Sequence, residues 1–399
     1  MSAVPSGIDL PQAVPAWQEA VAPLIEALAA TAVERDRQGG VPRVERDLLR
    51  RSGLLALSVP TALGGAGAAW ADVLQVVRRI ARVDSSVAHV FGFHHLLLAS
   101  ARLFGHAGQW RPWLAETVER RWFWGNALNP LDRGTVATPG DGGGWIFHGR
   151  KSFCSGAGDA DRLLASAFDA SGKLLIAVVP GDRAGIAVVG DWDNMGQRQT
   201  DSGSVLFDQV VVQADEMLTD PGPLSSPFAA LRPLLAQLLL ANVYLGLGEG
   251  ALAEAGDFTR EHARPWAGSV VQHATEDPFL LGHYGDFWLA LESARLLADH
   301  AATLFDAAWR QDLALTAASR GEVAIAVAAA KVAASRAGLE VAHRMFETTG
   351  PRSTTAALRL DRFWRNLRVH TLHDPLDYKR RELGDWALNG RLPPPSFYS

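Results

Sequence analysis

The 399-residue sequence is poor in cysteine, in basic runs and in long uninterrupted apolar segments. Cys154 is the single cysteine, so no disulfide can form within the chain. The net charge is -5 and the basic residues are scattered, which argues against nucleic acid or an anionic membrane as the main partner. The first residues lack the basic and apolar regions of a signal peptide. We therefore expect a cytoplasmic protein.

The longest apolar run, Leu234 to Gly248, is interrupted by Gln237 and Asn242. It is shorter than the ~20 residues that a membrane-spanning helix needs. We therefore expect no membrane span here and interpret the run as a buried helix. A hydrophobic content of 48% is enough for a large core, and the length favours two or three substructures.

Two common kinds of site are also missing from the sequence. No H-E-x-x-H motif or Cys/His ligand set occurs, so we predict no metal site. GLGEGA (246–251) fits the dinucleotide fingerprint G-x-G-x-x-A, but the run before it is long and rich in Leu and Ala. No repeated strand-helix units follow. The pattern favours a glycine-containing bundle helix over a nicotinamide site.

What the sequence does contain is one compact segment of sheet between two helical blocks. Short β-branched runs separated by Pro, Gly and Asp predict strands at Leu174–Pro180, Ala184–Gly190 and Ser204–Val212, in a small antiparallel barrel or meander. The expected fold class is α+β and mostly α. The expected domains are an N-terminal helical domain (1–120), a central β domain (121–222) and a C-terminal helical bundle with a tail (223–399).

The helical blocks follow from apolar spacing. Three- and four-residue spacing predicts helices within residues 17–60, and one or two helices over Ala71–Phe104. Within Gly321–Phe346, apolar residues recur every seven positions, which is typical of a helix packed in a bundle. Leu291–Trp309 is its expected neighbour.

Three places carry candidate functional side chains. In FCSGA, Ser155 is flanked by small residues, so backbone could approach a flat ligand there; an ordinary turn after a strand is the alternative. His89 shares a helix face with Phe93 and is either a ligand-contacting or a core histidine. His373 comes shortly before Pro375, at the end of a helix, where the alternative is a solvated basic helix end.

Taken together, these segments resemble a known family. GNALNP, KSFCSGAG, MGQRQTDSGS, ANVYLGLGEGAL, TREHARPW and FWRNLRVHTLHDP follow one another as in the flavin monooxygenases built on the acyl-CoA dehydrogenase fold. The resemblance covers the chain from about residue 20 and is strongest to dibenzothiophene monooxygenase and related sulfur-assimilation oxygenases. It implies an N-terminal helical domain, a central antiparallel β-barrel, a C-terminal four-helix bundle and a homotetramer.

The resemblance also implies roles for particular residues. Phe153, Ser155 and Asn126 match positions beside the flavin ring, and His89, Ser155 and His373 match those around its reactive carbon. Arg264 and Arg352 match neighbouring-subunit groups that hold the flavin phosphate, for which a guanidinium is suited. His89 and Phe93 fall in the substrate pocket. A tyrosine is expected where Phe93 stands, which leaves the exact substrate open.

The implied reaction is that of a two-component monooxygenase. A separate NAD(P)H:flavin reductase would supply reduced FMN, which forms a C4a-hydroperoxyflavin with O2 and oxygenates a small apolar organosulfur compound such as a thioether or sulfoxide. An FAD-dependent acyl-CoA dehydrogenase, or an aromatic or nitrogen hydroxylase of the same fold, is the alternative. The segment before Pro375 places Asp374 where the dehydrogenases have their glutamate base. The shorter side chain makes proton abstraction from an acyl-CoA unfavourable.

Overall fold

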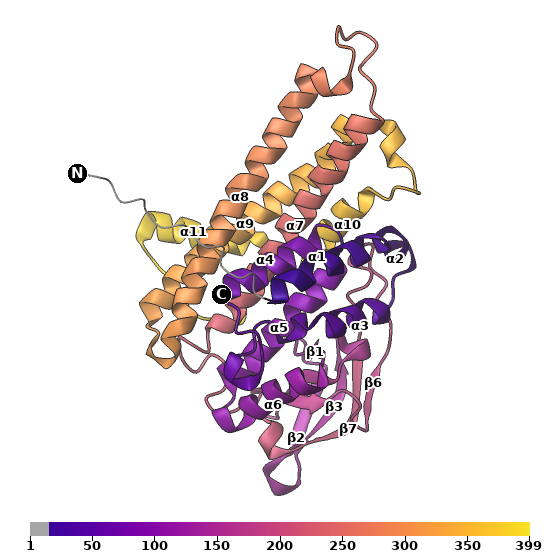
Figure 1. Cartoon of the computed structure of the whole chain (residues 1–399). Helices are drawn as coiled ribbons and strands as arrows, with labels where there is room; N and C mark the ends of the chain where they lie inside the picture. The colour runs from indigo at the N-terminus through magenta and orange to yellow at the C-terminus, as the bar shows by residue number, and fades with distance from the viewer. Residues whose placement is uncertain (1–15) are drawn as a thin grey trace, which may run out of the picture.

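A computed structural model of the protein describes residues 16–399. The chain forms a first group of helices, then a sheet, then a group of long helices (Figure 1). The first group agrees with the helices expected before residue 120: several helices form within residues 17–60, and the one or two helices predicted over Ala71–Phe104 are two. Their bounds are α1 (Ala16–Ala29), α2 (Ala32–Gln38), α3 (Arg43–Ser52), α4 (Trp70–Ala81), α5 (Ser85–Phe104) and α6 (Ala107–Arg120).

Helix α5 is the central helix of the first group. The Asp84 carboxylate accepts a hydrogen bond from the Val87 amide at 2.9 Å and so caps its N-terminus. By length and composition, α5 and α7 (Leu231–Glu261) could each cross a membrane, but 94% of each apolar segment is buried inside the protein. Both are therefore core helices, which confirms the buried helix predicted at Leu234–Gly248.

The strands form one seven-stranded sheet in the order β1-β4-β2-β3-β7-β6, with β5 paired to β4. The three strands predicted in its second half are present as β5, β6 and β7. The expectation of an antiparallel arrangement is wrong in part, because β4 pairs in parallel with both β1 and β2 and the sheet is mixed. Alternation in a sequence identifies a strand but not the direction of its neighbour. The bounds are β1 (Trp124–Ala127), β2 (Thr135–Pro139), β3 (Trp145–Lys151), β4 (Arg162–Phe168), β5 (Leu174–Pro180), β6 (Ile186–Val188) and β7 (Val205–Val212).

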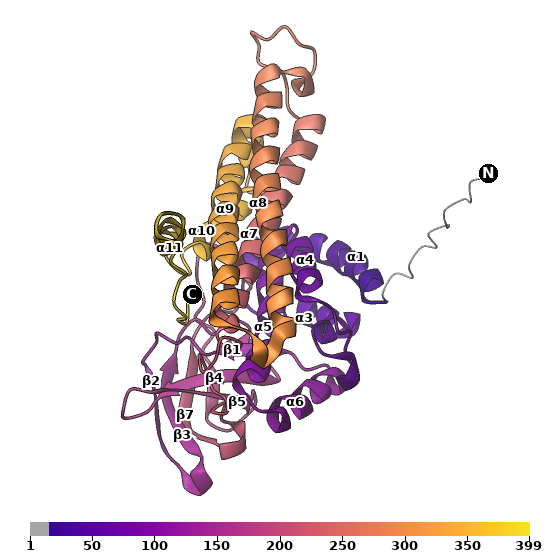
Figure 2. The same cartoon turned by 90° about the vertical axis from the view of Figure 1, so that its left-hand side faces the viewer.

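The third group contains three long helices that lie side by side (Figures 1 and 2). They are α7, α8 (Pro278–Gln311) and α9 (Ala317–Thr349), and the shorter α10 (Asp361–His370) and α11 (Leu376–Asn389) pack against α9. Asp277 caps α8 by accepting from the Phe279 amide at 2.9 Å. The pairing of Leu291–Trp309 with Gly321–Phe346 is confirmed in α8 and α9.

The glycines of GLGEGA lie inside α7 and bring it close to α4. A Cβ added to Gly246 would lie 2.3 Å from the Arg78 carbonyl oxygen, and one added to Gly250 would lie 2.1 Å from that of Arg82. Only residues without a Cβ allow this approach of two helix backbones. The prediction that GLGEGA belongs to a bundle helix is confirmed. Its glycines allow α7 to pack closely against α4.

Candidate functional site

A cavity of about 480 Å³ lies where all three parts of the chain meet. Its walls come from helices α5, α7 and α10, from β1 and the loop after it, from the loops that follow β3 and β6, from the connection between α10 and α11 and from the C-terminal tail. The chain ends between the sheet and the bundle (Figures 1 and 2). Six predicted site residues line this cavity: His89, Phe93, Asn126, Phe153, Ser155 and His373. These residues lie far apart in the sequence, from His89 to His373, and only the fold brings them together.

The turn after β3 is held in an unusual backbone conformation at the cavity wall. Phe153 has φ +56°, which is rare for an aromatic residue and costs free energy unless its neighbours enforce it. The Cys154 amide donates to the Gly203 carbonyl, and the Asn126 amide donates to the Ser155 carbonyl, each at 2.9 Å. Phe153 is left 60% exposed, with its ring edge-on to Trp192 at 6.2 Å. The ring is therefore presented to the cavity by a braced turn.

Ser155 is the first member of a chain of hydroxyl groups. Thr200 donates to the Gln197 carbonyl at 2.9 Å, and Ser202 donates to Thr200 at 2.7 Å. The Ser155 and Ser202 oxygens are 2.7 Å apart, and because each hydroxyl has one proton, Ser155 is the donor of that pair. The proton of Ser155 is thus engaged by Ser202, and the Ser155 oxygen retains the capacity to accept a hydrogen bond from a ligand.

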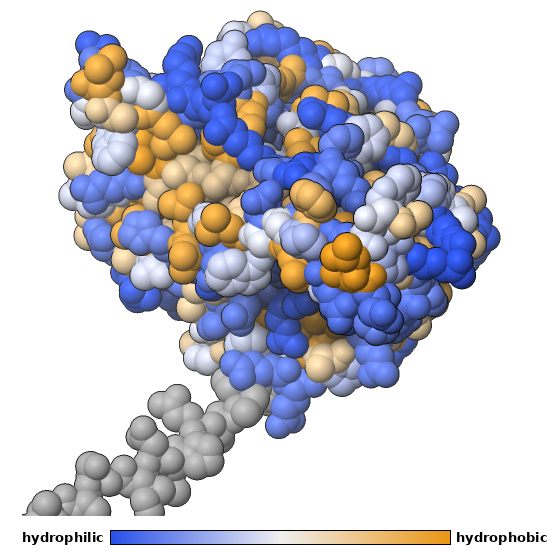
Figure 3. Space-filling view, turned by 90° about the horizontal axis from the view of Figure 1, so that it is seen from above, coloured by the Kyte–Doolittle hydropathy of each residue, from blue (hydrophilic) through white to orange (hydrophobic). Residues whose placement is uncertain are grey.

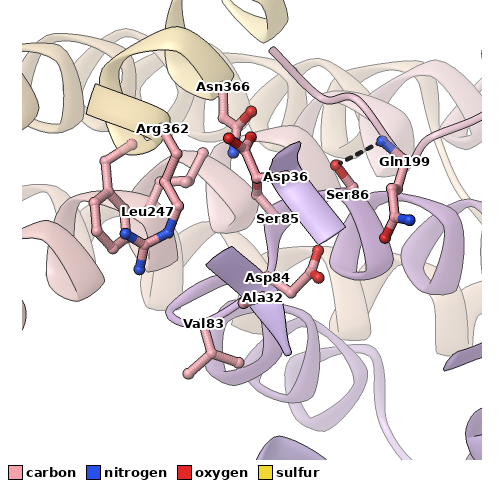
Figure 4. A pocket seen from close by; sticks show the side chains of 11 residues that line it. Ala32, Asp36, Val83, Asp84, Ser85, Ser86, Gln199, Leu247, Arg362 and Asn366 are labelled. Carbon is pink, nitrogen blue, oxygen red and sulfur yellow. Dashed lines mark hydrogen bonds between the residues drawn. The ribbon is translucent and has the colours of Figure 1, made fainter. Parts of the chain in front are cut away.

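The loop that carries Thr200 and Ser202 is fastened by a small polar pocket behind it (Figure 4). The Gln199 amide donates to the Ser86 hydroxyl at 3.4 Å, and the Gln197 side chain donates to Ser85 at 3.0 Å. From α10, the Asn366 side chain accepts from the Gln197 amide at 2.6 Å. The pocket has a volume of about 20 Å³, enough for about one water molecule. It positions the loop and is too small to bind a ligand of its own.

His89 is a buried imidazole without a protein partner. Its ring stacks on Phe93 with centroids 4.1 Å apart and lies 4.7 Å from the ring of His370. Neither ring nitrogen has a hydrogen-bond partner within the described part of the chain. Burial, and secondarily the nearby His373, lowers the pKa of His89 to about 3, so the ring is neutral at pH 7. One nitrogen can donate and the other can accept, so the ring has hydrogen-bonding capacity that no residue of the described chain uses.

The buried histidines give the protein an acid-sensitive stability. Burial also lowers the pKa of His94 to about 4. Because these folded-state values lie below the ordinary 6.5, protons bind the unfolded chain first, and the stability present above pH 6.5 is lost as pH falls. We expect the free energy of unfolding, measured by urea denaturation, to drop by at least about 3 kcal/mol between pH 6.5 and pH 5. His89 and His94 together account for about 3 kcal/mol, and His95 and His370, whose pKa burial also lowers, add to the loss.

A matched variant separates this effect from general acid sensitivity. His94→Gln keeps a neutral amide beside the Leu55 carbonyl and the Trp124 amide, which the imidazole now contacts. It should make the loss between pH 6.5 and pH 5 smaller by about 1.5 kcal/mol, since one titrating group is removed while His89, His95 and His370 remain. A free energy of unfolding that stays level between pH 6.5 and pH 5 would contradict the assignment.

His373 is held by a buried ion pair. Its Nδ1 donates to Asp374 at 3.1 Å, and the same carboxylate oxygen accepts from Lys331 of α9, which also contacts the Gln237 side chain. Burial by itself would raise the pKa of Asp374, but the hydrogen bond from His373 and the charge of Lys331 lower it well below its usual range. Burial lowers the pKa of Lys331 to about 8, so it remains largely protonated at pH 7. Asp374 therefore fixes the His373 tautomer and leaves Nε2 for the cavity.

Arg264 and Arg352 do not line this cavity. They belong to a second, larger hollow of about 740 Å³, between the α7–α8 connection and the segment after α9. Figure 1 shows that connection at the end of the bundle farthest from the sheet. Within one copy of the chain, these two arginines are therefore separated from the other six predicted site residues.

Several cavity residues were not predicted from the sequence. Arg232 and Gln237 of α7 line it, as do Phe397 and Tyr398 of the C-terminal tail. Lys331 lies behind it. Arg232 and Lys331 do carry a signal, because each is an isolated charge in an apolar helix, and such a charge is seldom buried without a function or a partner. The tail carries no comparable signal.

Family models match three consecutive parts of the chain. Residues 15–121 match the acyl-CoA dehydrogenase N-terminal domain, residues 129–210 the middle domain and residues 238–378 the C-terminal domain. The order agrees with the helix, sheet and helix arrangement of the structure. The described fold and the family models are therefore consistent along most of the chain.

Individual relatives are similar over almost their full length. A probable FMNH2-dependent monooxygenase of Pseudomonas putida is 59% identical over 93% of this chain and 94% of its own. The structure of methanesulfinate monooxygenase MsuC from Pseudomonas fluorescens shares 58% identity with a TM-score of 0.95, over 97% of this chain and all of that one. The FMN-bound structure of TdsC, a dibenzothiophene monooxygenase from Paenibacillus sp. A11-2, shares 41% identity with a TM-score of 0.92, over 96% of this chain and all of that one.

Proposed function

Because the chain belongs to the FMNH2-dependent monooxygenases that share the acyl-CoA dehydrogenase fold, we propose that it oxygenates a small organosulfur compound with reduced FMN and O2. The observation that carries this proposal is the cavity itself. It joins a braced aromatic turn, a hydroxyl acceptor and the three imidazoles of His89, His370 and His373 in one space. A separate NAD(P)H:flavin reductase would supply the reduced flavin, and the cytoplasm is the compartment we infer.

The residues present suit a flavin ring. The cavity volume of about 480 Å³ is in the range of small-molecule sites. The unpaired ring nitrogens of His89 and the acceptor oxygen of Ser155 are polar groups that a ligand can satisfy. Phe153 offers an exposed aromatic face, and Asn126 supports the turn that carries it. Reduced FMN, when bound, supplies the electrons that activate O2 for transfer of one oxygen atom.

The protein's own contribution is to position groups and to exclude water. His373 offers Nε2 to the cavity while Asp374 holds Nδ1, so the ring can hold a proton at Nε2 or release it. His89 is neutral and offers a second donor and acceptor pair. Leu128, Ala236 and Phe397 add apolar walls that limit water access. We assign His373, Ser155, His89 and Asn126 to the reacting end of the cavity, with Phe93 in the substrate pocket.

The alternative of an FAD-dependent acyl-CoA dehydrogenase lacks a base. Asp374 does not line the cavity, and its carboxylate is engaged by Lys331 and His373. An ionised carboxylate with a strongly lowered pKa is also a weak base. Ala236 and Gln237, which line the cavity from α7, have no basic group that could abstract a proton in place of Asp374.

The decisive experiment combines the purified protein with a flavin reductase, NADH, FMN and O2. Methanesulfinate and dibenzothiophene would be tested in parallel, with product, NADH and hydrogen peroxide measured in the same samples. We expect product to account for most of the NADH with at least one sulfur compound, and only hydrogen peroxide when substrate is left out. Anaerobic bleaching of bound flavin by an acyl-CoA, without product from any sulfur compound, would contradict the proposal.

We also propose that copies of the chain assemble through α8, as a homotetramer, and that Arg264 and Arg352 of a neighbouring copy hold the flavin phosphate. The outer side of α8 exposes large apolar side chains, among them Phe279 (79%), Trp288 (59%) and Leu296 (57%). Figure 3 shows apolar side chains gathered at several places on the face seen from above. Apolar surface of this extent is typical of an interface. The inferred domain boundaries, at 120/121 and 222/223, set α8 within the C-terminal domain.

A charge on α8 should disrupt this assembly. We expect Trp288→Glu to lower the molar mass measured by sedimentation velocity and to weaken FMN binding at least 10-fold, because the phosphate site would lose its second copy. Val136→Glu, at an exposed apolar position of β2, is the matched control and should leave the mass unchanged. A Trp288→Glu variant with the parent's mass would refute the interface.

A further inference from the structure

Arg232 is a buried cation whose charge no residue of the described chain neutralises. It is 7% exposed at the start of α7, and its Nε donates to the Ser100 hydroxyl at 3.3 Å. Ser100 gives its own proton to the Leu96 carbonyl, so it can only accept from the guanidinium. The other N–H groups of Arg232 have no acceptor among residues 16–399, and none of the ion pairs of this range includes Arg232.

Such an arrangement is costly unless a ligand completes it. Removing a charged guanidinium from water is unfavourable when no partner compensates the lost hydration. Burial lowers the pKa of Arg232 to about 10, so the side chain is still charged at pH 7. Lys331, a buried cation of α9 behind the cavity, is neutralised by Asp374. Arg320, near the start of α9, is buried without an ion pair among the described residues, but it donates to the Pro393 carbonyl at 3.1 Å and does not line the cavity. Arg232 differs from both, because its unpaired N–H groups belong to a cavity residue and a bound molecule can reach them.

The cavity supplies the place for that partner. Arg232 lines it, and among the lining residues it is the only one with a permanent charge, since none of them is Asp, Glu or Lys. The other lining residues on α7 are Ala236 and Gln237, and those on the tail are Phe397 and Tyr398; none of these four carries a charge at pH 7. A cavity whose one permanent charge is a cation, with polar groups and no carboxylate side chain in its lining, fits a small organic anion better than a neutral aromatic molecule.

We propose that the substrate is a small organosulfur anion and that Arg232 binds its negatively charged oxygens. This inference rests on the proposed monooxygenase function and adds the charge of the substrate to it. The planar guanidinium presents two parallel N–H donors, which match the two oxygens of a sulfinate or a carboxylate. For a sulfinate the balance is RSO2⁻ + O2 + FMNH2 → RSO3⁻ + H2O + FMN. Sulfur loses two electrons and forms one new S–O bond, FMNH2 gives two electrons, and the second oxygen atom leaves as water.

The charge can be tested with pairs of compounds that differ in little else. Methanesulfinate is compared with dimethyl sulfoxide, its neutral analogue, and 3-(methylthio)propanoate with its methyl ester. We expect the anion of at least one pair to have a kcat/KM at least 100-fold higher than its neutral partner. The first pair places the charge on the reacting sulfur and the second at a distance from it, so the preferred pair locates Arg232 relative to the reacting end.

Variants then connect this selectivity to Arg232. Arg232→Gln should reduce the ratio of kcat/KM for the anion to that for its neutral partner about 100-fold, and Arg232→Lys should retain part of it because the charge remains. Arg102→Gln, on α5 outside the cavity, is the matched control for loss of an arginine and should leave the ratio unchanged. An unchanged ratio in folded Arg232→Gln, or a neutral compound preferred in both pairs, overturns the proposal.

A binding measurement separates this proposal from the proposed function. Methanesulfonate, which has no further oxygen to accept at sulfur, is titrated by calorimetry into the protein without flavin. We expect binding that weakens at least 10-fold in Arg232→Gln. Oxygenation of no sulfur compound would refute the monooxygenase, whereas oxygenation of neutral compounds without methanesulfonate binding would refute only the anion. A loss of FMN affinity in Arg232→Gln with an unchanged ratio would assign the charge to the flavin and overturn the proposal.

Discussion

Replacing His373 by Ala should reduce coupled turnover by about 10²-fold or more, while the protein continues to oxidise reduced FMN. His373 is the cavity imidazole whose orientation is fixed, because Asp374 holds Nδ1 and Lys331 holds Asp374. Without the ring, the reacting end loses a group that can hold a proton at Nε2. NADH consumption would then appear as hydrogen peroxide, so the ratio of product to NADH is the quantity to measure.

Two further variants sharpen this test. Ser155→Ala should have an effect of similar size if its oxygen contacts the flavin, since the hydroxyl chain through Ser202 would end without its first member. His148→Ala removes an exposed histidine from β3, outside the cavity, and should leave coupling unchanged. Full coupling in both His373→Ala and Ser155→Ala would remove these two residues from the reacting end.

The second large effect is expected at Lys331. Lys331→Met should lower the free energy of unfolding by about 3–5 kcal/mol, because it leaves the Asp374 carboxylate buried without its counter-ion. Lys331 is 1% exposed and Asp374 8% exposed, so water cannot compensate well. The midpoint of urea denaturation at pH 7 measures the loss. Lys173→Met, an exposed lysine in the turn between β4 and β5, should change the stability by less than about 0.5 kcal/mol.

A double variant separates the charge from the packing. Adding Asp374→Asn to Lys331→Met removes the uncompensated carboxylate and should restore most of the lost stability. Coupled turnover of the double variant should be lower than that of the parent protein, because an amide oxygen holds the Nδ1 proton of His373 less strongly than a carboxylate does. Stability of Lys331→Met equal to that of the parent would show that the pair contributes nothing to folding.

Much of the fold could be predicted because it is encoded locally. The apolar spacing of α8 and α9 and the β-branched runs of β5 and β7 are set by neighbouring residues, and these elements form where they were expected. The parallel pairing of β4 with β1 and β2 could not be predicted. The same alternation of apolar and polar residues occurs in parallel and antiparallel strands. The direction of a neighbouring strand depends on how the chain returns across the sheet.

The site shows the same division. The sequence by itself determined the type of element that carries each candidate, and its motifs indicated the family and its flavin chemistry. The tertiary structure alone placed His89, Ser155 and His373 around one cavity and set Arg264 and Arg352 apart from it. It also decided that Lys331 is paired and that Arg232 is not. The reason is physical, because the cost of a buried charge depends on which distant groups face it, and local sequence contains no record of those groups.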